Sequence, residues 1–179
     1  MIIRPGYFCF SAERNLLRYK LICFDCPSSG SLSAKLPPMR TIPTIDYSEA
    51  KRVVDLIVEK ASQMRKAVVV AVADSHGELI CFARMDGASV SSITIAMNKA
   101  WTAARAGKPT QEIGEKVRHP ERGHDIAYYG DSRFVGWGGG IPVRNHGEVV
   151  GAVAVSGLSS IEDIGLASLG VQLLAMPSS

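Results

Sequence analysis

Two histidines, His119 and His124, lie five positions apart in a segment that is dense with titratable side chains. The segment spans residues 116–125 and includes Asp125, and it is followed by Tyr128, Tyr129, Asp131 and Arg133. An unperturbed imidazole titrates at about 6.5, so either histidine suits proton transfer near neutral pH. A solvated charged loop is the alternative interpretation. With Asp125 the spacing gives only a weak indication of a metal site, and no metal ligand set is predicted.

A run of three glycines, Gly138, Gly139 and Gly140, follows this segment directly after Trp137. Consecutive glycines can expose backbone N–H groups that bind an anion. They also allow a loop to pass close over a sheet or a neighbouring subunit, and the sequence leaves both interpretations open. The run is not a P-loop, because Lys and Ser/Thr are missing and a strand rather than a helix follows it.

Three further charged residues are candidates for the same cleft: Arg84, Lys99 and Asp163. Arg84 ends an apolar strand, and arginine binds carboxylates through two parallel hydrogen bonds. Lys99 falls outside the apolar stripe of its helix, and lysine supplies a point charge or a Schiff base. Asp163 lies in the first turn of the last helix, where helix capping is the favoured interpretation. For Arg84 and Lys99 the alternative is surface ion pairing.

Together these residues describe a cofactor-free enzyme that acts on a small unsaturated carboxylate. Arg84, Arg133 and the glycine amides would hold the acid, and Lys99 with His119 or His124 would carry the chemistry. The inventory suits a tautomerase, deaminase or elimination reaction. It lacks the GxSxG, HExxH and dinucleotide-binding motifs of other enzyme classes.

The elements that position these residues follow from local patterns. Asp46 and Glu49 have capping-box spacing, and apolar residues then recur at i, i+3, i+4 and i+7. A Val-rich run after them is typical of a strand covered on both faces. The expected elements are a helix over 46–65, strands over 67–73 and 78–84, a helix over 90–106, a short helix capped by Thr110 and ending near Val117, strands over 141–144 and 148–155, and a final helix capped by Ser159 or Ser160.

This order of elements predicts the fold class. Helix, hairpin, helices, hairpin and helix imply an antiparallel sheet with helices on its faces. The short hairpins exclude a parallel doubly wound sheet. We therefore predict an α+β fold, a three-layer α-β-α sandwich with a central antiparallel sheet.

The chain of 179 residues is long enough for one domain with a substantial core. We place that domain at residues 46–176, after a poorly structured extension over 1–45 and before a short tail over 177–179. The extension reads as dispensable or as the result of an upstream start, in preference to a transit peptide. Its cysteines, Cys9, Cys23 and Cys26, do not complete a metal site, and Cys81 is expected to be a buried small hydrophobe.

Charge and hydropathy restrict the partners. A net charge of +3 with both signs interspersed does not favour nucleic acid. No apolar run approaches the roughly 18 residues of a membrane span. The cysteine usage fits a reducing compartment, so we expect a cytoplasmic protein.

Four motifs recur in order along the chain: VAVADSHGELICFARMDGA, NKAWTAARAGKPT, GWGGGIPV and HGEVVGAVAVSGLSSIED. On these motifs, residues 46–176 resemble the GlcG/HbpS family, which includes the C-terminal domain of PduO-type proteins. The resemblance implies a profilin-like sandwich that assembles into homo-oligomers. Because relatives bind haem, belong to corrinoid metabolism or occur in catabolic operons, it also implies a protein that holds haem or a related planar cofactor in a catabolic or cofactor-related context.

The resemblance implies that a histidine near the N-terminal helix is the axial ligand of haem iron, and this sequence departs from that pattern. Residues 46–65 contain no histidine. His76 and His146 precede glycines in turns and are expected to be exposed, which leaves His119 and His124. The cofactor therefore stays open, with a tetrapyrrole or a small organic acid as the expected partner. The preferred interpretation is a ligand-binding protein, and the alternative is the cofactor-free enzyme.

Overall fold

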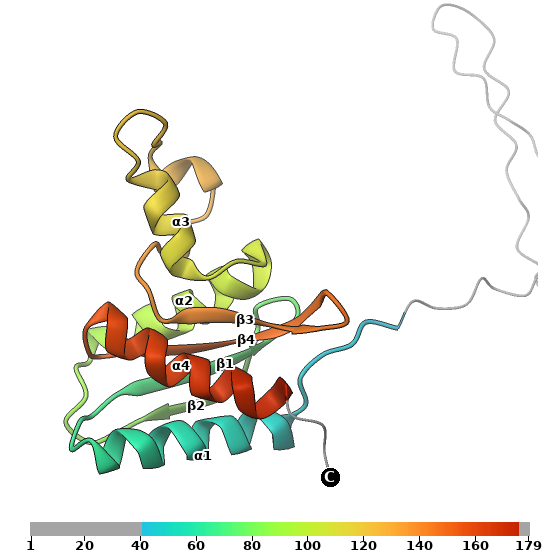
Figure 1. Cartoon of the computed structure of the whole chain (residues 1–179), viewed down its shortest axis with the longest axis vertical. Helices are drawn as coiled ribbons and strands as arrows, with labels where there is room; N and C mark the ends of the chain where they lie inside the picture. The colour runs from blue at the N-terminus through green and yellow to red at the C-terminus, as the bar shows by residue number, and fades with distance from the viewer. Residues whose placement is uncertain (1–40, 176–179) are drawn as a thin grey trace, which may run out of the picture. The chain divides into compact units, whose positions relative to one another are not determined.

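A computed structural model of the chain describes residues 41–175, and Figure 1 shows its helices and strands. In chain order these are α1 (Tyr47–Gln63), β1 (Val69–Asp74), β2 (Leu79–Arg84), α2 (Ser91–Ala106), α3 (Thr110–Val117), a short 3-10 helix η1 (Ile126–Tyr129), β3 (Gly140–Asn145), β4 (Glu148–Ser156) and α4 (Ser160–Ala175). Cys9, Cys23 and Cys26 lie outside the described residues.

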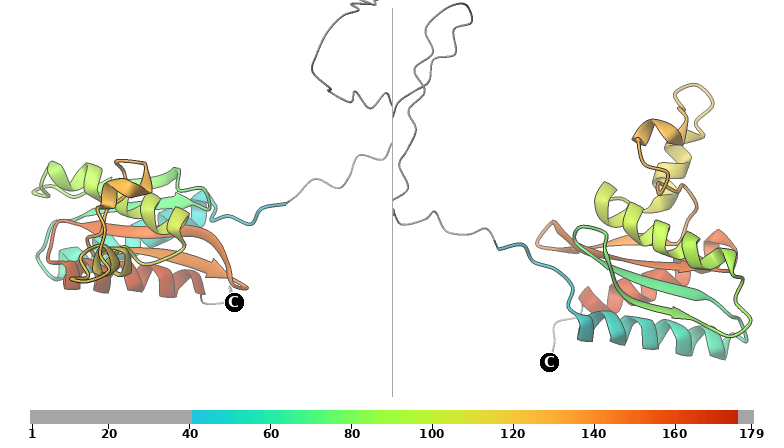
Figure 2. Two further views of the ribbon diagram at one scale, coloured as in Figure 1. Left: turned by 90° about the horizontal axis from the view of Figure 1, so that it is seen from above. Right: turned by 180° about the vertical axis from the view of Figure 1, so that it is seen from behind.

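The four strands form one antiparallel sheet in the order β2-β1-β4-β3. Helices α1 and α4 cover one face and α2 covers the other, as the view from above in Figure 2 shows. Within this sheet Val69 pairs with Arg84 on one side and with Ser156 on the other. The predicted α+β sandwich with a central antiparallel sheet is confirmed.

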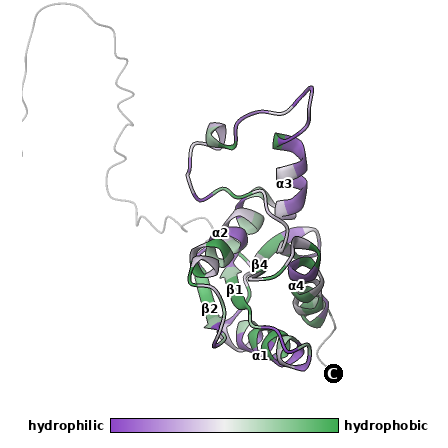
Figure 3. Cartoon of the chain, turned by 90° about the vertical axis from the view of Figure 1, so that its left-hand side faces the viewer, coloured by the Kyte–Doolittle hydropathy of each residue, from purple (hydrophilic) through white to green (hydrophobic). Residues whose placement is uncertain are grey.

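Side chains along the central strands alternate between the two faces of the sheet, so they fill both the core under α1 and α4 and the core under α2. Val70 and Val72 of β1 belong to the large core under α1 and α4, whereas Val69 and Ala71 pack towards the alanines of α2. Such small side chains let α2 lie close to the sheet. Colouring by hydropathy shows apolar central strands and a polar α3 (Figure 3). Cys81, expected to be buried, is half-buried and packs against the larger core.

The chain packs against the sheet directly before α1 begins. The Asp46 carboxylate accepts from the Glu49 N–H at 2.8 Å, and the Glu49 carboxylate accepts from the Asp46 N–H at 3.0 Å, which is the predicted capping box. Ile45 is already buried, and its N–H donates to the Val150 carbonyl at 2.9 Å. This contact fixes the chain against β4 before the helix begins.

Thr110 does not cap α3, contrary to our prediction. The N-cap residue is Pro109, which makes no side-chain cap. The Thr110 hydroxyl instead donates to the Trp137 carbonyl at 2.6 Å and accepts from the Gly140 N–H at 3.0 Å. Because Thr110 is fully buried, its hydroxyl needs these partners, and the glycine run supplies them.

Helix α3 and the segment after it project from the sandwich next to β3 (Figure 1). The projecting segment, residues 118–139, contains η1 and leads back to the sheet through the glycine run. Within residues 41–175, no helix combines the length and the apolar character that crossing a membrane requires.

Candidate functional site

Lys99 lies in the interior of the molecule, which corrects our expectation that it falls outside the buried stripe of its helix. It is 2% exposed, and its Nζ donates to Asp163 Oδ2 at 2.8 Å and to the Val155 carbonyl at 2.9 Å. The partners come from α4 and the end of β4, so the lysine joins elements on both sides of the sheet. A buried ammonium requires such charged and hydrogen-bonding partners.

Asp163 is buried as well, and both of its carboxylate oxygens are occupied. Oδ1 accepts from the Leu158 N–H at 3.2 Å, and Oδ2 accepts from Lys99. Burial raises the pKa of the Asp163 carboxyl, and the ion pair with Lys99 opposes this rise. Ser159 caps the helix, as predicted for Ser159 or Ser160, since its hydroxyl and Glu162 form a reciprocal capping pair.

The glycine run covers the Lys99–Asp163 ion pair at close range. Gly139 has φ +115, and a Cβ at this position would lie 2.7 Å from Asp163 Cβ and 2.7 Å from the Val155 carbonyl oxygen. A Cβ at Gly138 would lie 2.7 Å from Ile164, and one at Gly140 would lie 2.5 Å from the Lys99 carbonyl oxygen. The Gly140 N–H is used by Thr110. Close passage over the sheet therefore accounts for these glycines, whereas their contact with a ligand stays a prediction.

A polar pocket of about 300 Å³ opens beside the ion pair, between the N-terminal halves of α2 and α4. Its polar side chains are Ser92, Lys99, Ser156, Ser160 and Asp163, and its apolar part comes from Ile95, Leu158 and Trp137. We refer to these residues together with Gly157 as the Lys99 pocket.

A second pocket, of about 390 Å³, lies in the projecting segment. It is lined by Val117, Arg118, His124, Ile126, Val135, Gly136 and Trp137, and we call it the His124 pocket. The His124 ring is half-buried, and its centroid is 5.6 Å from that of Tyr129. Within residues 41–175 the His124 ring nitrogens have no hydrogen-bond partner. Trp137 lines both pockets.

His119 has a different environment from His124. Its Nδ1 accepts from the N–H groups of Glu121 and Arg122, both at 3.2 Å. The ring therefore organises its own loop. In the part of the chain that the structure describes, His119, His124 and Asp125 do not form a cluster that would hold a metal ion.

The two arginine candidates lie away from the Lys99 pocket. Arg84 is exposed at the end of β2, and β1 separates it from Ser156. Arg133 forms an ion pair with Asp131 at 2.7 Å, and its guanidinium lies 4.1 Å from the centroid of the Trp101 ring. The hydrogen bonds from Arg133 lower the pKa of Asp131 to about 2. Both arginines stay ligand candidates only as predictions.

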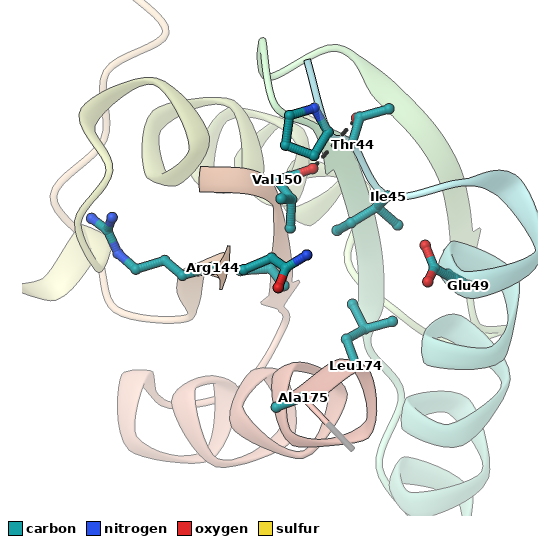
Figure 4. Close-up of a pocket in the computed structure, with 10 residues that line it drawn as sticks. Thr44, Ile45, Glu49, Arg144, Val150, Leu174 and Ala175 are labelled. Atoms are coloured by element: carbon teal, nitrogen blue, oxygen red, sulfur yellow. Dashed lines mark hydrogen bonds between the residues drawn. The ribbon is translucent and has the colours of Figure 1, made fainter. Parts of the chain in front are cut away.

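A further pocket, of about 370 Å³, lies between the start of α1 and the end of α4 (Figure 4). Two of its polar side chains already have partners, since Glu49 caps α1 and Thr44 donates to the Val150 carbonyl. The Arg144 guanidinium points away from the pocket and donates to the Gly107 carbonyl at 2.6 Å. This arrangement offers a ligand few hydrogen bonds.

Sequence reasoning missed Ser92, Ser156 and Arg118. Ser92 lies seven positions before Lys99, a spacing that places both on one side of α2. Ser156 continues the alternation of Ala152 and Ala154, which pack on the side of the sheet that faces α2. These signals exist in the sequence, but they become meaningful only once Lys99 is known to be buried.

Residues 45–172 match the protein family described as haem degrading protein HbpS-like. The chain belongs to the HbpS-like family. An uncharacterized 15.0 kDa protein of the dhaT-dhaS intergenic region of Citrobacter freundii is 37% identical over 116 residues, which cover 65% of this chain and 82% of the relative. The resemblance inferred from the motifs is thereby confirmed.

Two solved structures extend this comparison. The Klebsiella pneumoniae protein ORFY has a TM-score of 0.73 and 31% identity, and the match covers 80% of this chain and 99% of that chain. A PduOC structure in complex with haem has a TM-score of 0.68 and 26% identity, covering 73% of this chain and 94% of that chain. These likenesses confirm the family fold.

Proposed function

We propose that this HbpS-like chain is a small-ligand-binding protein that holds haem or a related planar tetrapyrrole in the His124 pocket. The observation that carries the proposal is the half-buried His124 ring, whose nitrogens lack hydrogen-bond partners within residues 41–175. An imidazole in such surroundings is a suitable axial donor for haem iron. His119 is a poorer donor, because two backbone N–H groups donate to its Nδ1 and the Arg122 guanidinium lies 3.2 Å from its Nε2, so both ring nitrogens have partners.

The remaining side chains of the His124 pocket suit a large apolar ring. The apolar part of the lining comes from Val117, Ile126, Val135 and Trp137, and ligand pockets are commonly lined in this way. Arg118 adds a guanidinium at the same pocket, where it donates to the Gly136 carbonyl at 3.2 Å. Arginine also pairs well with carboxylates such as those of a tetrapyrrole. These residues would orient the ring and exclude water, whereas bound haem supplies an iron centre for redox or gas-ligand chemistry.

The relatives support this proposal without assigning residues. The family is described as haem degrading, and the PduOC structure was solved as a haem complex. The cofactor-free enzyme has less support, because within residues 41–175 no hydrogen bond or ion pair links Arg84, Lys99 and the two histidines. The catabolic context and the cytoplasmic location stay predictions.

Hemin titration tests the proposal directly. We expect a saturable, shifted Soret band at one haem per chain for the wild-type protein. His124→Ala removes the donor, so the band should change position and the affinity should fall roughly tenfold or more. His76→Ala is the matched control, because His76 is exposed in a turn outside the pocket. A His124→Ala spectrum and affinity identical to the wild type would contradict His124 as the ligand.

We also propose that the chain forms a homo-oligomer. Tyr128 and Ile161 are 81% and 83% exposed, and Trp137 is 57% exposed. Large apolar side chains at the surface often mark sites of association.

A further inference from the structure

The Lys99 pocket contains hydrogen-bond donors that the protein leaves unused. An ammonium has three N–H groups, and Lys99 uses one for Asp163 and one for the Val155 carbonyl. No acceptor for the third lies within residues 41–175. Both Asp163 oxygens are occupied, by Lys99 and by the Leu158 N–H. The group of this ion pair that remains free to form a hydrogen bond is therefore a donor, the third N–H of Lys99.

Two serine hydroxyls line the same pocket without partners. Ser92 is 5% exposed and Ser156 is 3% exposed. Neither hydroxyl forms a hydrogen bond to any group in the described part of the chain. Among the described side chains only Trp101 Nε1 is fully buried without a partner, so the two serine oxygens keep contact with the open pocket. Two free hydroxyls beside an ammonium therefore offer hydrogen bonds to a ligand that enters the pocket.

The charge of the pocket favours a monoanion as that partner. Lys99 and Asp163 neutralise each other, and the N-terminus of the 16-residue helix α4 adds a partial positive charge. This surplus is too small for a dianion such as a phosphate monoester. Ile95, Leu158 and Trp137 contribute the apolar part of the lining. The complementary ligand thus has a singly charged acceptor group and a small apolar body.

We propose that the Lys99 pocket binds a small monocarboxylic acid, separately from the His124 pocket. Its carboxylate accepts from Lys99, Ser92 and Ser156, and its apolar part packs against Trp137. The site needs neither histidine and neither Arg84 nor Arg133. It also does not depend on haem binding, because the polar groups of the two pockets differ.

Calorimetric titration with benzoate and with butyrate tests this site, with benzamide as the neutral match for benzoate. We expect saturable binding of at least one of the two acids and much weaker binding of benzamide. Replacing both serines, Ser92→Ala with Ser156→Ala, should weaken acid binding roughly tenfold or more, because both hydroxyls bond a charged group. Ser168→Ala is the control, since that hydroxyl bonds the Ile164 carbonyl on α4 away from the pocket.

Three outcomes would overturn the proposal: no binding of either acid, equal binding of benzoate and benzamide, or unchanged affinity in the double serine variant. Circular dichroism establishes that the variants are folded. Quenching of Trp137 fluorescence by benzoate, lost in Trp137→Phe, locates the ligand independently of the serine variants. Hemin titration of the double serine variant should match the wild type, so failure of one proposal is distinguishable from failure of the other.

Discussion

At the scale of single residues, the buried Lys99–Asp163 ion pair links helix α2 to helix α4. Each side chain is 3% exposed, and the two lie on helices that cover opposite faces of the sheet. Removing two charges from water costs free energy that their attraction offsets only when the geometry is good and the other polar atoms are satisfied. Both Asp163 oxygens are satisfied, because each accepts a hydrogen bond. Lys99 keeps one unsatisfied N–H, which is the reason to assign the pocket a ligand.

Lys99→Met should destabilise the fold by about 3–5 kcal/mol, because it leaves the Asp163 carboxylate buried without its partner. Adding Asp163→Asn should restore part of this loss, since the amide removes the unpaired charge. Urea denaturation at neutral pH measures both effects. Lys51→Met is the control, because the Lys51–Asp55 pair is exposed and its loss should change the free energy of unfolding little. Equal effects of Lys99→Met and Lys51→Met would contradict this account.

At the scale of elements, the glycine run connects the projecting segment to β3. The run is held by the buried Thr110 hydroxyl and by the hydrogen bond from the Val155 N–H to the Gly139 carbonyl. It passes so close to α4 and α2 that side chains would not fit. This connection brings Trp137 to the lining of both the Lys99 pocket and the His124 pocket.

Gly139→Ala should therefore cost more stability than Gly147→Ala. Both glycines have positive φ, +115 and +86, and alanine at either position carries backbone strain of about 1–3 kcal/mol. Only Gly139 adds a collision with Asp163 and the Val155 carbonyl, since a Cβ at Gly147 meets no atom within 4 Å. Thermal and urea denaturation compare the two variants. If their losses are equal, the close passage over the ion pair contributes nothing.

At the scale of the whole molecule, the structure is a packed sandwich with a polar projecting segment. The sandwich buries its core between α2 on one side and α1 with α4 on the other (Figures 1 and 2). The segment instead exposes Tyr128 and Trp137. A segment that extends from its own domain with exposed aromatic side chains has the features of a contact between copies of the chain.

Light scattering of the purified protein should thus give a mass that is a multiple of the 19.2 kDa chain. Tyr128→Ser should shift this mass towards the single chain, because it removes a large exposed aromatic side chain. Tyr47→Ser, which changes an exposed tyrosine on α1, is the control. A wild-type mass equal to one chain would show that the exposed aromatic residues serve another purpose.

Much of the fold could be predicted because its determinants are local. The Asp46–Glu49 capping box, the hairpins and the cap at Ser159 depend on residues within a few positions of one another. The predicted cap at Thr110 and the expected place of Lys99 outside the buried stripe of its helix were wrong for the opposite reason. Thr110 bonds residues 27 and 30 positions away, and Lys99 bonds residues 56 and 64 positions away. No helical period reveals such partners.

The sequence by itself determined the family, the antiparallel α+β sandwich and the candidate histidines, because periodicity, caps and motif order are properties of neighbouring residues. Only the tertiary structure decided that Lys99 and Asp163 form a buried ion pair, that His119 is engaged by its own loop, and that His124 faces an apolar pocket. Those outcomes depend on burial and on partners from distant elements. A donor or acceptor can bind a ligand only where the folded chain has not already given it a hydrogen-bond partner.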